Sequence, residues 1–240
     1  MSNAGRACVV LPTYDERENL PQIVPAVLAA SPVLDVLVVD DDSPDGTGAI
    51  ADSLAAREPR VRVLHRPHKE GLGRAYLAGF DVALRAGYGR VLGMDADFSH
   101  DPAALPSLLA VSRDADLVLG SRYVAGGGTV NWGVGRRLLS RGGNLYARAV
   151  LGAGIHDLTG GFKCFRREVL ERIDLGTVTT TGYAFQIELT WRALRAGFRV
   201  VEIPIIFADR RVGHSKMTRG IVLEALWKVW AIRRYLPDRL

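Results

Sequence analysis

Short apolar runs alternate with helical patterns along the first half of the chain. Val and Leu dominate the runs Ala7–Leu11, Val36–Val39, Val61–Leu64, Val91–Met94 and Leu117–Leu119, which contain little polar alternation. Such runs are typical of strands that are covered on both faces, and the intervening segments have the apolar spacing of helices. The pattern therefore predicts an α/β fold: a Rossmann-like, doubly wound and mostly parallel sheet in a single domain.

The pattern changes in the second half of the chain. Glycine and arginine are concentrated in Ala125–Gly143, which is long for an ordinary connection, so we expect a mobile functional loop able to act as a lid. Beyond it, the residues predict a helix over Thr181–Ala196 and an extended segment over Val200–Phe207, in which Pro204 marks a sheet edge.

The C-terminal segment predicts an amphipathic helix. It spans Met217–Tyr235, contains Trp227 and Trp230, and has basic residues near its end. Such a helix either docks on the core or rests on an anionic lipid surface, and the sequence leaves both alternatives open. We therefore expect a main domain over residues 1–216, followed by this helix within residues 217–240.

Composition narrows the class of protein. The 240 residues are 48% hydrophobic and 24% charged, which excludes a disordered chain. Cys8 and Cys164 lie far apart in the sequence, so neither a disulfide framework nor a zinc site is supported, and we expect a reducing compartment. The sequence contains no run of about 18 apolar residues that could span a bilayer, and its start lacks the layout of a signal peptide. We therefore do not expect an integral membrane protein.

The balance of charges is basic, with a formal net charge of +5 and a pI near 9.5. A basic chain favours an anionic partner, which could be a nucleic acid, a phosphorylated small molecule or an acidic lipid surface. The net charge does not distinguish among these partners. The acidic residues say more about the ligand, because they lie where predicted strands end.

Two groups of carboxylates follow predicted strands. Asp95 and Asp97 come directly after the fourth run, and two carboxylates at a strand end can bind one Mg²⁺ or Mn²⁺ that also holds a diphosphate. The alternative is that they only cap a helix or a turn. Asp41 belongs to a second group at the end of the second run, where a carboxylate can accept hydrogen bonds from a nucleobase or a ribose. In an open parallel sheet, ligands bind at this edge.

The first half of the chain contains four short motifs in order: P-T-Y-x-E from Pro12, V-V-D-D-x-S-P-D-G-T from Val38, G-L-G-R-A from Gly71 and M-D-A-D-x-S-H from Met94. Motifs in this order and at this spacing are typical of family 2 glycosyltransferases, which the chain resembles. In the second half, the motifs G-S-R-Y from Gly120, R-R-x-x-S-R-G from Arg136, D-L-T-G-G-F-K from Asp157 and D-R-x-x-G-x-S-K from Asp209 resemble those of the polyprenol-phosphate mannosyltransferases, also called dolichol-phosphate mannose synthases.

The resemblance implies a GT-A fold and an inverting, metal-dependent enzyme. It would transfer mannose from GDP-mannose to a polyprenyl phosphate at the cytoplasmic face of a membrane, with Mg²⁺ or Mn²⁺ as cofactor. The alternative enzyme is a polyprenyl-phosphate glucosyl- or N-acetylglucosaminyltransferase that uses a UDP-sugar. From another class, a non-catalytic nucleotide-sugar or nucleic-acid binding module also fits the basic charge, but we expect no nucleic-acid partner.

The resemblance also assigns roles by position. The residues implied to bind the donor are Pro12, Tyr14, Glu16, Val39, Asp41, Asp95, Ala96, Asp97, Arg210 and Lys216. Those implied to bind the acceptor phosphate are Arg122, Arg136 and Ser140, and Asp97, Arg122 and Arg136 are the expected catalytic residues. The metal would be held by Asp95, Asp97 and Ser99, although some relatives have an amide where this chain has the weaker hydroxyl ligand of Ser99. Water can complete the coordination there.

The chemistry is consistent with these roles. The second pKa of a phosphomonoester is about 6, so the acceptor oxygen is already an ionised nucleophile at neutral pH. Asp97 is therefore expected to act as a metal ligand first and as a base only second. Because the lipid tail of the acceptor stays in the bilayer, we expect peripheral membrane binding through Gly126–Gly143 and the C-terminal helix, with or without an integral-membrane anchoring partner.

Overall fold

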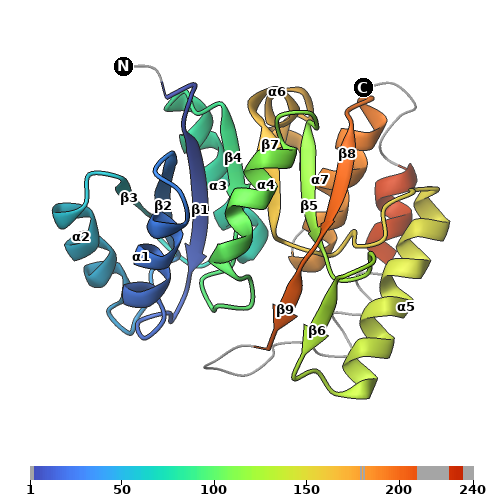
Figure 1. Cartoon of the computed structure of the whole chain (residues 1–240), viewed down its shortest axis with the longest axis horizontal. Helices are drawn as coiled ribbons and strands as arrows, with labels where there is room; N and C mark the ends of the chain where they lie inside the picture. The colour runs from blue at the N-terminus through green and yellow to red at the C-terminus, as the bar shows by residue number, and fades with distance from the viewer. Residues whose placement is uncertain (1–2, 179, 181, 210–226, 235–240) are drawn as a thin grey trace.

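A seven-stranded sheet forms the centre of the protein, as seen in the computed structural model (Figure 1). The structure describes residues 3–178, 180, 182–209 and 227–234. The sheet order is β3-β2-β1-β4-β7-β5-β8. The parallel strands are β1 (Ala7–Thr13), β2 (Leu34–Asp40), β3 (Val61–His65), β4 (Arg90–Gly93), β5 (Leu117–Ser121) and β8 (Val200–Pro204), and β7 (Lys163–Arg166) is antiparallel to both of its neighbours.

Helices cover both faces of the sheet, which explains why the strands are apolar throughout. One core layer contains residues of α1 (Leu20–Ala30), α2 (Thr47–Arg57) and α4 (Leu105–Val111). The other contains residues of α3 (Leu72–Arg85), α5 (Val134–Leu151), α6 (Arg167–Arg172) and α7 (Gly182–Arg195). All seven residues of β1 and of β2 are buried. The predicted doubly wound sheet in a single α/β domain is confirmed.

The five strands predicted from the first half are all present. β2 begins two residues earlier than expected, at Leu34, and β1 continues to Thr13. The sequence analysis did not predict β7, which lies between β4 and β5 and pairs Gly93 and Leu119 with Lys163. Because β7 runs antiparallel, its first residue lies at the edge where the parallel strands end.

The prediction of an irregular loop over Ala125–Gly143 is wrong. Residues 128–130 form β6 (Gly128–Val130), and α5 begins at Val134 and continues to Leu151. A Cβ added to Gly135 or Gly142 in this helix would meet open space, so no close contact requires glycine at these positions. Their presence therefore does not indicate a loop. What holds the helix is the burial of Asn144, Ala147 and Leu151 on one face, at helical spacing.

The last segments agree with their predicted types. Helix α7 spans Gly182–Arg195, and the extended segment is divided into β8, which is an edge strand of the large sheet, and β9 (Ile206–Ala208). β9 pairs with β6 in a separate two-stranded sheet. Of the predicted C-terminal helix, residues 227–234 are helical, and Val229 and Ile232 are buried in the core while Trp227 and Trp230 are exposed.

The described helices include none that is both long enough and apolar enough to cross a membrane. The two short 3₁₀ helices, η1 (Pro102–Ala104) and η2 (Leu175–Thr177), connect longer elements. The C-terminal ends of the parallel strands, together with β6, β9 and the start of α5, form one edge of the molecule (Figure 1).

Candidate active site

The loops that follow β1 and β2 are bonded to each other at this edge. The backbone N–H groups of Glu16 and Arg17 donate to Thr47 Oγ1 (3.0 Å) and Asp45 Oδ2 (3.1 Å). Asp45 Oδ1 in turn accepts from the backbone N–H of Thr47 at 2.9 Å. Burial alone would raise the pKa of Asp45, but the hydrogen bonds from Thr47 and Arg17 lower it below its ordinary value. These hydrogen bonds therefore hold the two loops together.

An ion-pair network lies beside these two loops. Arg66, just after β3, bonds the carboxylates of both Asp41 and Glu70, and the side chains of Arg66 and Asp41 are almost fully buried. The Lys69 ammonium lies over the Tyr14 ring, 3.2 Å from its centroid. The sequence analysis selected Asp41 and Tyr14 but missed Arg66, Lys69 and Glu70. The signal that could have found them is a run of charged residues directly after a strand.

The next strand end carries the paired acids. Asp97 is buried and accepts the backbone N–H of Ser99 at 3.0 Å, while Asp95 Oδ1 accepts the hydroxyl of Tyr76 at 2.8 Å. Burial and the charge of Asp95 raise the pKa of the Tyr76 hydroxyl well above its ordinary value, so this hydroxyl stays a donor. The structure thus holds both carboxylates at one strand end, as the sequence predicts.

His100 is bonded to the backbone of this loop. Its Nδ1 accepts the backbone N–H of Asp95 at 3.1 Å, and its ring stacks on Phe162 with the centroids 4.9 Å apart. Burial lowers the pKa of His100, so the imidazole is neutral, with its proton on Nε2. The sequence analysis assigns His100 no role, whereas its hydrogen bond ties it directly to the backbone of Asp95.

A divalent cation fits the residues of this loop. Ser99 Oγ is buried and has no hydrogen-bond partner among the described residues, although it lies two residues from the buried Asp97. A buried hydroxyl without a partner is costly and calls for an explanation such as a bound ion. No three His, Cys, Asp or Glu side chains converge in the described part of the chain, so a cation here would take its other ligands from a diphosphate and water, which is usual for Mg²⁺.

Arg122 and Asp157 form a buried bidentate pair. Arg122 Nε and Nη2 donate to the two oxygens of Asp157, at 2.7 and 2.6 Å, and Nη2 also donates to Thr159 Oγ1 at 2.8 Å. Burial opposes ionisation of Asp157, but the hydrogen bonds and charge of Arg122 lower its pKa below the ordinary value. The guanidinium plane is thus fixed, and the sequence analysis did not foresee this partner.

Arg136, at the start of α5, is held differently. Its Nη1 donates to Asp209 at 2.7 Å, and its guanidinium lies 4.1 Å from the centroid of the Trp132 ring. Ser140, one turn further along α5, accepts the hydroxyl of Tyr123 at 2.6 Å. Tyr123 follows Arg122 in the chain, and the Arg122 guanidinium lies 5.2 Å from the Tyr123 ring centroid. Because the Arg122 guanidinium also lies 5.5 Å from the centroid of the Trp132 ring, aromatic neighbours link Arg122, Arg136 and Ser140.

A lysine that the sequence analysis did not single out lies within this region. Lys163 has an exposed fraction of 0%, and its Nζ donates to the backbone carbonyl of Gln186 at 2.6 Å. Burial lowers its pKa to about 7, against the opposing attraction of Asp157. Nearby, a Cβ added to Gly161 would lie 3.4 Å from Gln186 Nε2 and 3.9 Å from Asp95 Oδ1. The chain entering β7 thus passes directly beside the paired acids.

The other predicted residues divide into two groups. Pro12, Val39 and Ala96 are buried at the ends of β1, β2 and the loop after β4, and Glu16 accepts the side-chain amide of Asn19 at 2.7 Å. Arg210 and Lys216 lie outside the described residues. Their roles remain predictions, as do the roles assigned to the other site residues.

The comparisons with known proteins decide the family. Residues 8–174 match the family described as Glycosyl transferase family 2. The chain belongs to that family. It is 56% identical over 232 residues to a polyprenol monophosphomannose synthase from Mycolicibacterium smegmatis, covering 95% of this chain and 88% of that protein. It is 50% identical over 224 residues to an undecaprenyl-phosphate mannosyltransferase from Micrococcus luteus, covering 93% and 92%. This family 2 protein is therefore a glycosyltransferase.

Solved structures agree on the architecture. One is glucosyl-3-phosphoglycerate synthase from Mycobacterium tuberculosis in complex with Mn²⁺, uridine diphosphate and glucosyl-3-phosphoglycerate, with a TM-score of 0.67 and 19% identity over 95% of this chain and 78% of that chain. A second complex of the same enzyme, with Mn²⁺, uridine diphosphate and phosphoglyceric acid, has a TM-score of 0.68 and 20% identity over 97% and 80%. This likeness establishes the GT-A fold that the sequence predicts.

Proposed function

We propose that this glycosyltransferase transfers mannose from GDP-mannose to the phosphate of a polyprenol, with Mg²⁺ or Mn²⁺ as cofactor. The observation that carries the proposal is the 56% and 50% identity, over more than nine tenths of the chain, to two proteins named for mannosyl transfer to polyprenyl phosphates. The arrangement at the strand ends supports it, because candidate base-binding residues, acids for a metal and a group of arginines lie at the same edge of the sheet.

The residues at the ends of β1, β2 and β3 suit guanine. Asp41 offers a carboxylate to the N–H groups of a base, while Arg66 beside it offers donors to ring oxygens and nitrogens. Guanine has both kinds of group on adjacent positions. The Tyr14 ring, with Lys69 over it, supplies an aromatic face near the same loops. Specificity for the nucleoside would therefore come from the ends of β1, β2 and β3.

The two anions of the reaction would be held by different groups. Asp95, Asp97 and Ser99 would hold the cation, which when bound neutralises charge that develops on the departing diphosphate. Arg122 and Arg136 would bind phosphate oxygens, because guanidinium groups form paired hydrogen bonds with phosphate. In Arg122, the Nε and Nη2 groups donate to Asp157 and Thr159, so a phosphate would be bound through Nη1 of a guanidinium whose plane Asp157 fixes.

The reaction needs no strong general base. An oxygen of the ionised acceptor phosphate attacks the anomeric carbon of mannose and forms the new C–O bond there. The bond from that carbon to the diphosphate oxygen breaks, and its electron pair leaves with GDP. Attack from the side opposite the leaving group inverts the anomeric configuration. Asp157 keeps both carboxylate oxygens on Arg122 and so orients that arginine rather than accepting a proton.

The activity is tested by incubating the protein with radiolabelled GDP-mannose, Mg²⁺ or Mn²⁺ and polyprenyl phosphate, followed by extraction into organic solvent. We expect a labelled lipid product. Asp97→Asn should reduce its formation about a hundredfold or more, because metal stabilisation of a leaving phosphate contributes several kcal/mol. Asp101→Asn, which retains an acceptor for the nearby Ala103 N–H, is the matched control. Transfer from UDP-glucose but not from GDP-mannose would overturn the proposed donor.

We further propose that the enzyme binds the membrane peripherally, near the cytoplasmic face, to reach its lipid acceptor. On α5, Val134 and Leu138 have exposed fractions of 68% and 65%, and the Trp227 side chain is 75% exposed. Helix 227–234 and α5 lie side by side in Figure 1, and Val150 and Val229 belong to the same core cluster. Exposed apolar residues beside arginines are typical of surfaces that rest on anionic lipid.

Flotation with anionic liposomes tests this surface. We expect the intact chain to float, and the variant Trp227→Ser with Leu138→Glu to stay at the bottom of the gradient. Val33→Ser, at an exposed residue just before β2, is the control for loss of an apolar side chain elsewhere. Equal flotation of all three proteins would remove this surface from the mechanism, and failure of the intact chain to float would indicate recruitment by a membrane partner.

A further inference from the structure

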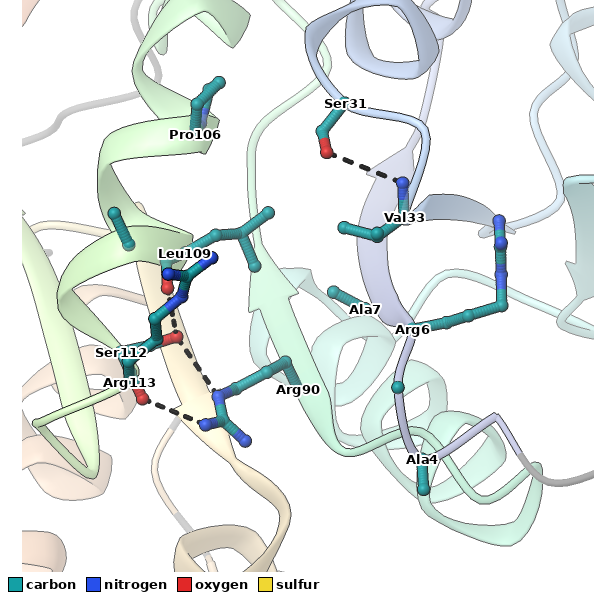
Figure 2. Close-up of a pocket in the computed structure, with 12 residues that line it drawn as sticks. Ala4, Arg6, Ala7, Ser31, Val33, Arg90, Pro106, Leu109, Ser112 and Arg113 are labelled. Carbon is teal, nitrogen blue, oxygen red and sulfur yellow. Dashed lines mark hydrogen bonds between the residues drawn. The ribbon is translucent and has the colours of Figure 1, made fainter.

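A pocket of about 510 Å³ lies at the opposite edge of the sheet, where the parallel strands begin (Figure 2). It is lined by the chain that leads into β1, the turn between α1 and β2, the start of β4, and α4 with the two residues that follow it. The paired acids are at the other ends of these strands, so the pocket is separate from the candidate active site. Its volume lies within the range of small-molecule sites, roughly 300 to 1,000 Å³.

Two walls of the pocket are apolar. Ala7 and Val33 lie on one side, and Leu109, Pro106 and Ala110 of α4 lie on the other. In Figure 2, the side chains of Leu109 and Val33 extend toward each other across the space. These walls can bury a short apolar group, but they offer no charge.

The charge comes from two arginines without an acidic partner. The Arg90 guanidinium is half-buried and donates only to neutral oxygens: Ser112 Oγ at 3.1 Å, the Ser112 carbonyl at 3.0 Å and the Gly89 carbonyl at 3.0 Å. Arg113 lines the pocket at the end of α4 with an exposed side chain. Among the described residues, neither arginine forms an ion pair. By contrast, Arg6 donates to both oxygens of Asp35, so its charge is balanced.

We propose that this pocket binds a small organic anion, a phosphomonoester carried on a short apolar body. A half-buried cation without a counter-ion is costly, and an arginine fork matches the oxygens of a phosphate. Arg90 is already fixed by its three hydrogen bonds, so little freedom is lost when an anion binds. The apolar body of the ligand would lie between Leu109 and Val33.

Calorimetric titration of the full chain tests the proposal, with hexyl phosphate, inorganic phosphate and hexanol as three separate probes. We expect hexyl phosphate to bind more tightly than either of the others, because only it uses both the arginines and the apolar walls. Ala110→Trp fills the pocket without changing the charge, and Arg113→Gln removes one cation. Each should weaken binding of hexyl phosphate about tenfold or more, in line with the strength of charge-assisted hydrogen bonds.

Arg57→Gln is the matched control, because Arg57 is an exposed arginine at the end of α2 and lies outside the pocket. It should leave the affinity unchanged, and circular dichroism should show all three variants folded. Equal affinity in the wild type, Ala110→Trp and Arg113→Gln would mean that hexyl phosphate binds elsewhere and would overturn the proposal. So would the absence of binding, or inorganic phosphate binding as tightly as hexyl phosphate.

Discussion

Arg122 and Asp157 face each other as a fork against a carboxylate, with Nε 2.7 Å from Oδ2 and Nη2 2.6 Å from Oδ1, in a site where Asp157 has no exposed surface. The pair joins the end of β5 to the segment that leads into β7. Its loss would therefore affect both the stability of the fold and the position of a candidate phosphate ligand.

Arg122→Ala should lower the free energy of unfolding by about 3–5 kcal/mol, because it leaves the buried charge of Asp157 without its cation. Arg122→Lys keeps a charge but loses the paired geometry, so it should be less destabilising and still reduce transfer activity. Urea denaturation measures the first effect, and assays well below the melting temperature measure the second. Full activity in a folded Arg122→Lys enzyme would contradict a phosphate-binding role.

His100→Phe should impair the use of the metal, because it removes the acceptor of the Asp95 N–H and lets the acidic loop shift. The metal concentration for half-maximal activity should rise, and the unfolding free energy should fall by about 1–3 kcal/mol for the unsatisfied N–H. His100→Asn keeps an acceptor near the Nδ1 position and should restore part of both. An unchanged metal dependence in His100→Phe would argue against the positioning role.

Ser99→Ala separates stability from metal binding. It removes a buried hydroxyl that has no partner among the described residues, so the unfolding free energy of the metal-free protein should stay the same or increase. If Ser99 is a ligand, the metal concentration for half-maximal activity should rise severalfold. Metal titrations of the transfer reaction provide the measurement, and an identical titration curve would exclude Ser99 from the coordination.

Asp209→Asn should strengthen binding of the acceptor if Arg136 binds its phosphate as proposed, because the Asp209 carboxylate would then compete for the same guanidinium. The KM for polyprenyl phosphate should fall by no more than about fivefold, since a partly exposed ion pair contributes about 1 kcal/mol or less. Arg136→Ala should raise the same KM. Steady-state kinetics at varied acceptor concentration distinguish them, and an increase in KM for Asp209→Asn would mean that Asp209 holds Arg136 in its working position.

Lys163 should make stability depend on pH. Its pKa is about 7 in the folded chain, against an ordinary lysine value of 10.5, so between these values the unfolded chain binds more protons. The contribution of Lys163 therefore raises the unfolding free energy with pH across that range, by at most about 1.4 kcal/mol per pH unit. Lys163→Met should remove this slope, as measured by urea denaturation from pH 7 to 9.5. Parallel curves for the two proteins would contradict the shift.

The sequence predicted the sheet because a buried parallel strand leaves a local signal, a run of Val and Leu. It predicted Asp95 and Asp97 because strand ends are marked by the abrupt change from such a run to acids. β7 has only four residues, and its place between β4 and β5 depends on pairing with strands distant in the sequence. No local pattern encodes that pairing.

The partners of site residues were likewise not predictable. Three ion pairs of the site join residues that are between 25 and 73 positions apart in the sequence. They are Arg122 with Asp157, Arg66 with Asp41 and Arg136 with Asp209. In α5, glycine content was misleading, because glycine weakens a helix by only about 1 kcal/mol at each position and burial of one face can outweigh it.

The place of β7 in the sheet has a consequence for synthesis of the chain on the ribosome. β1 to β4 can pair with one another as soon as they emerge, but the outer edge of β4 has no partner until residues 163–166 have been made. During that interval a row of backbone donors and acceptors is open to other chains, which is the usual route to aggregation. Pairing of β7 with β4 and β5 therefore joins the two parts of the sheet and at the same time covers the exposed edge of β4.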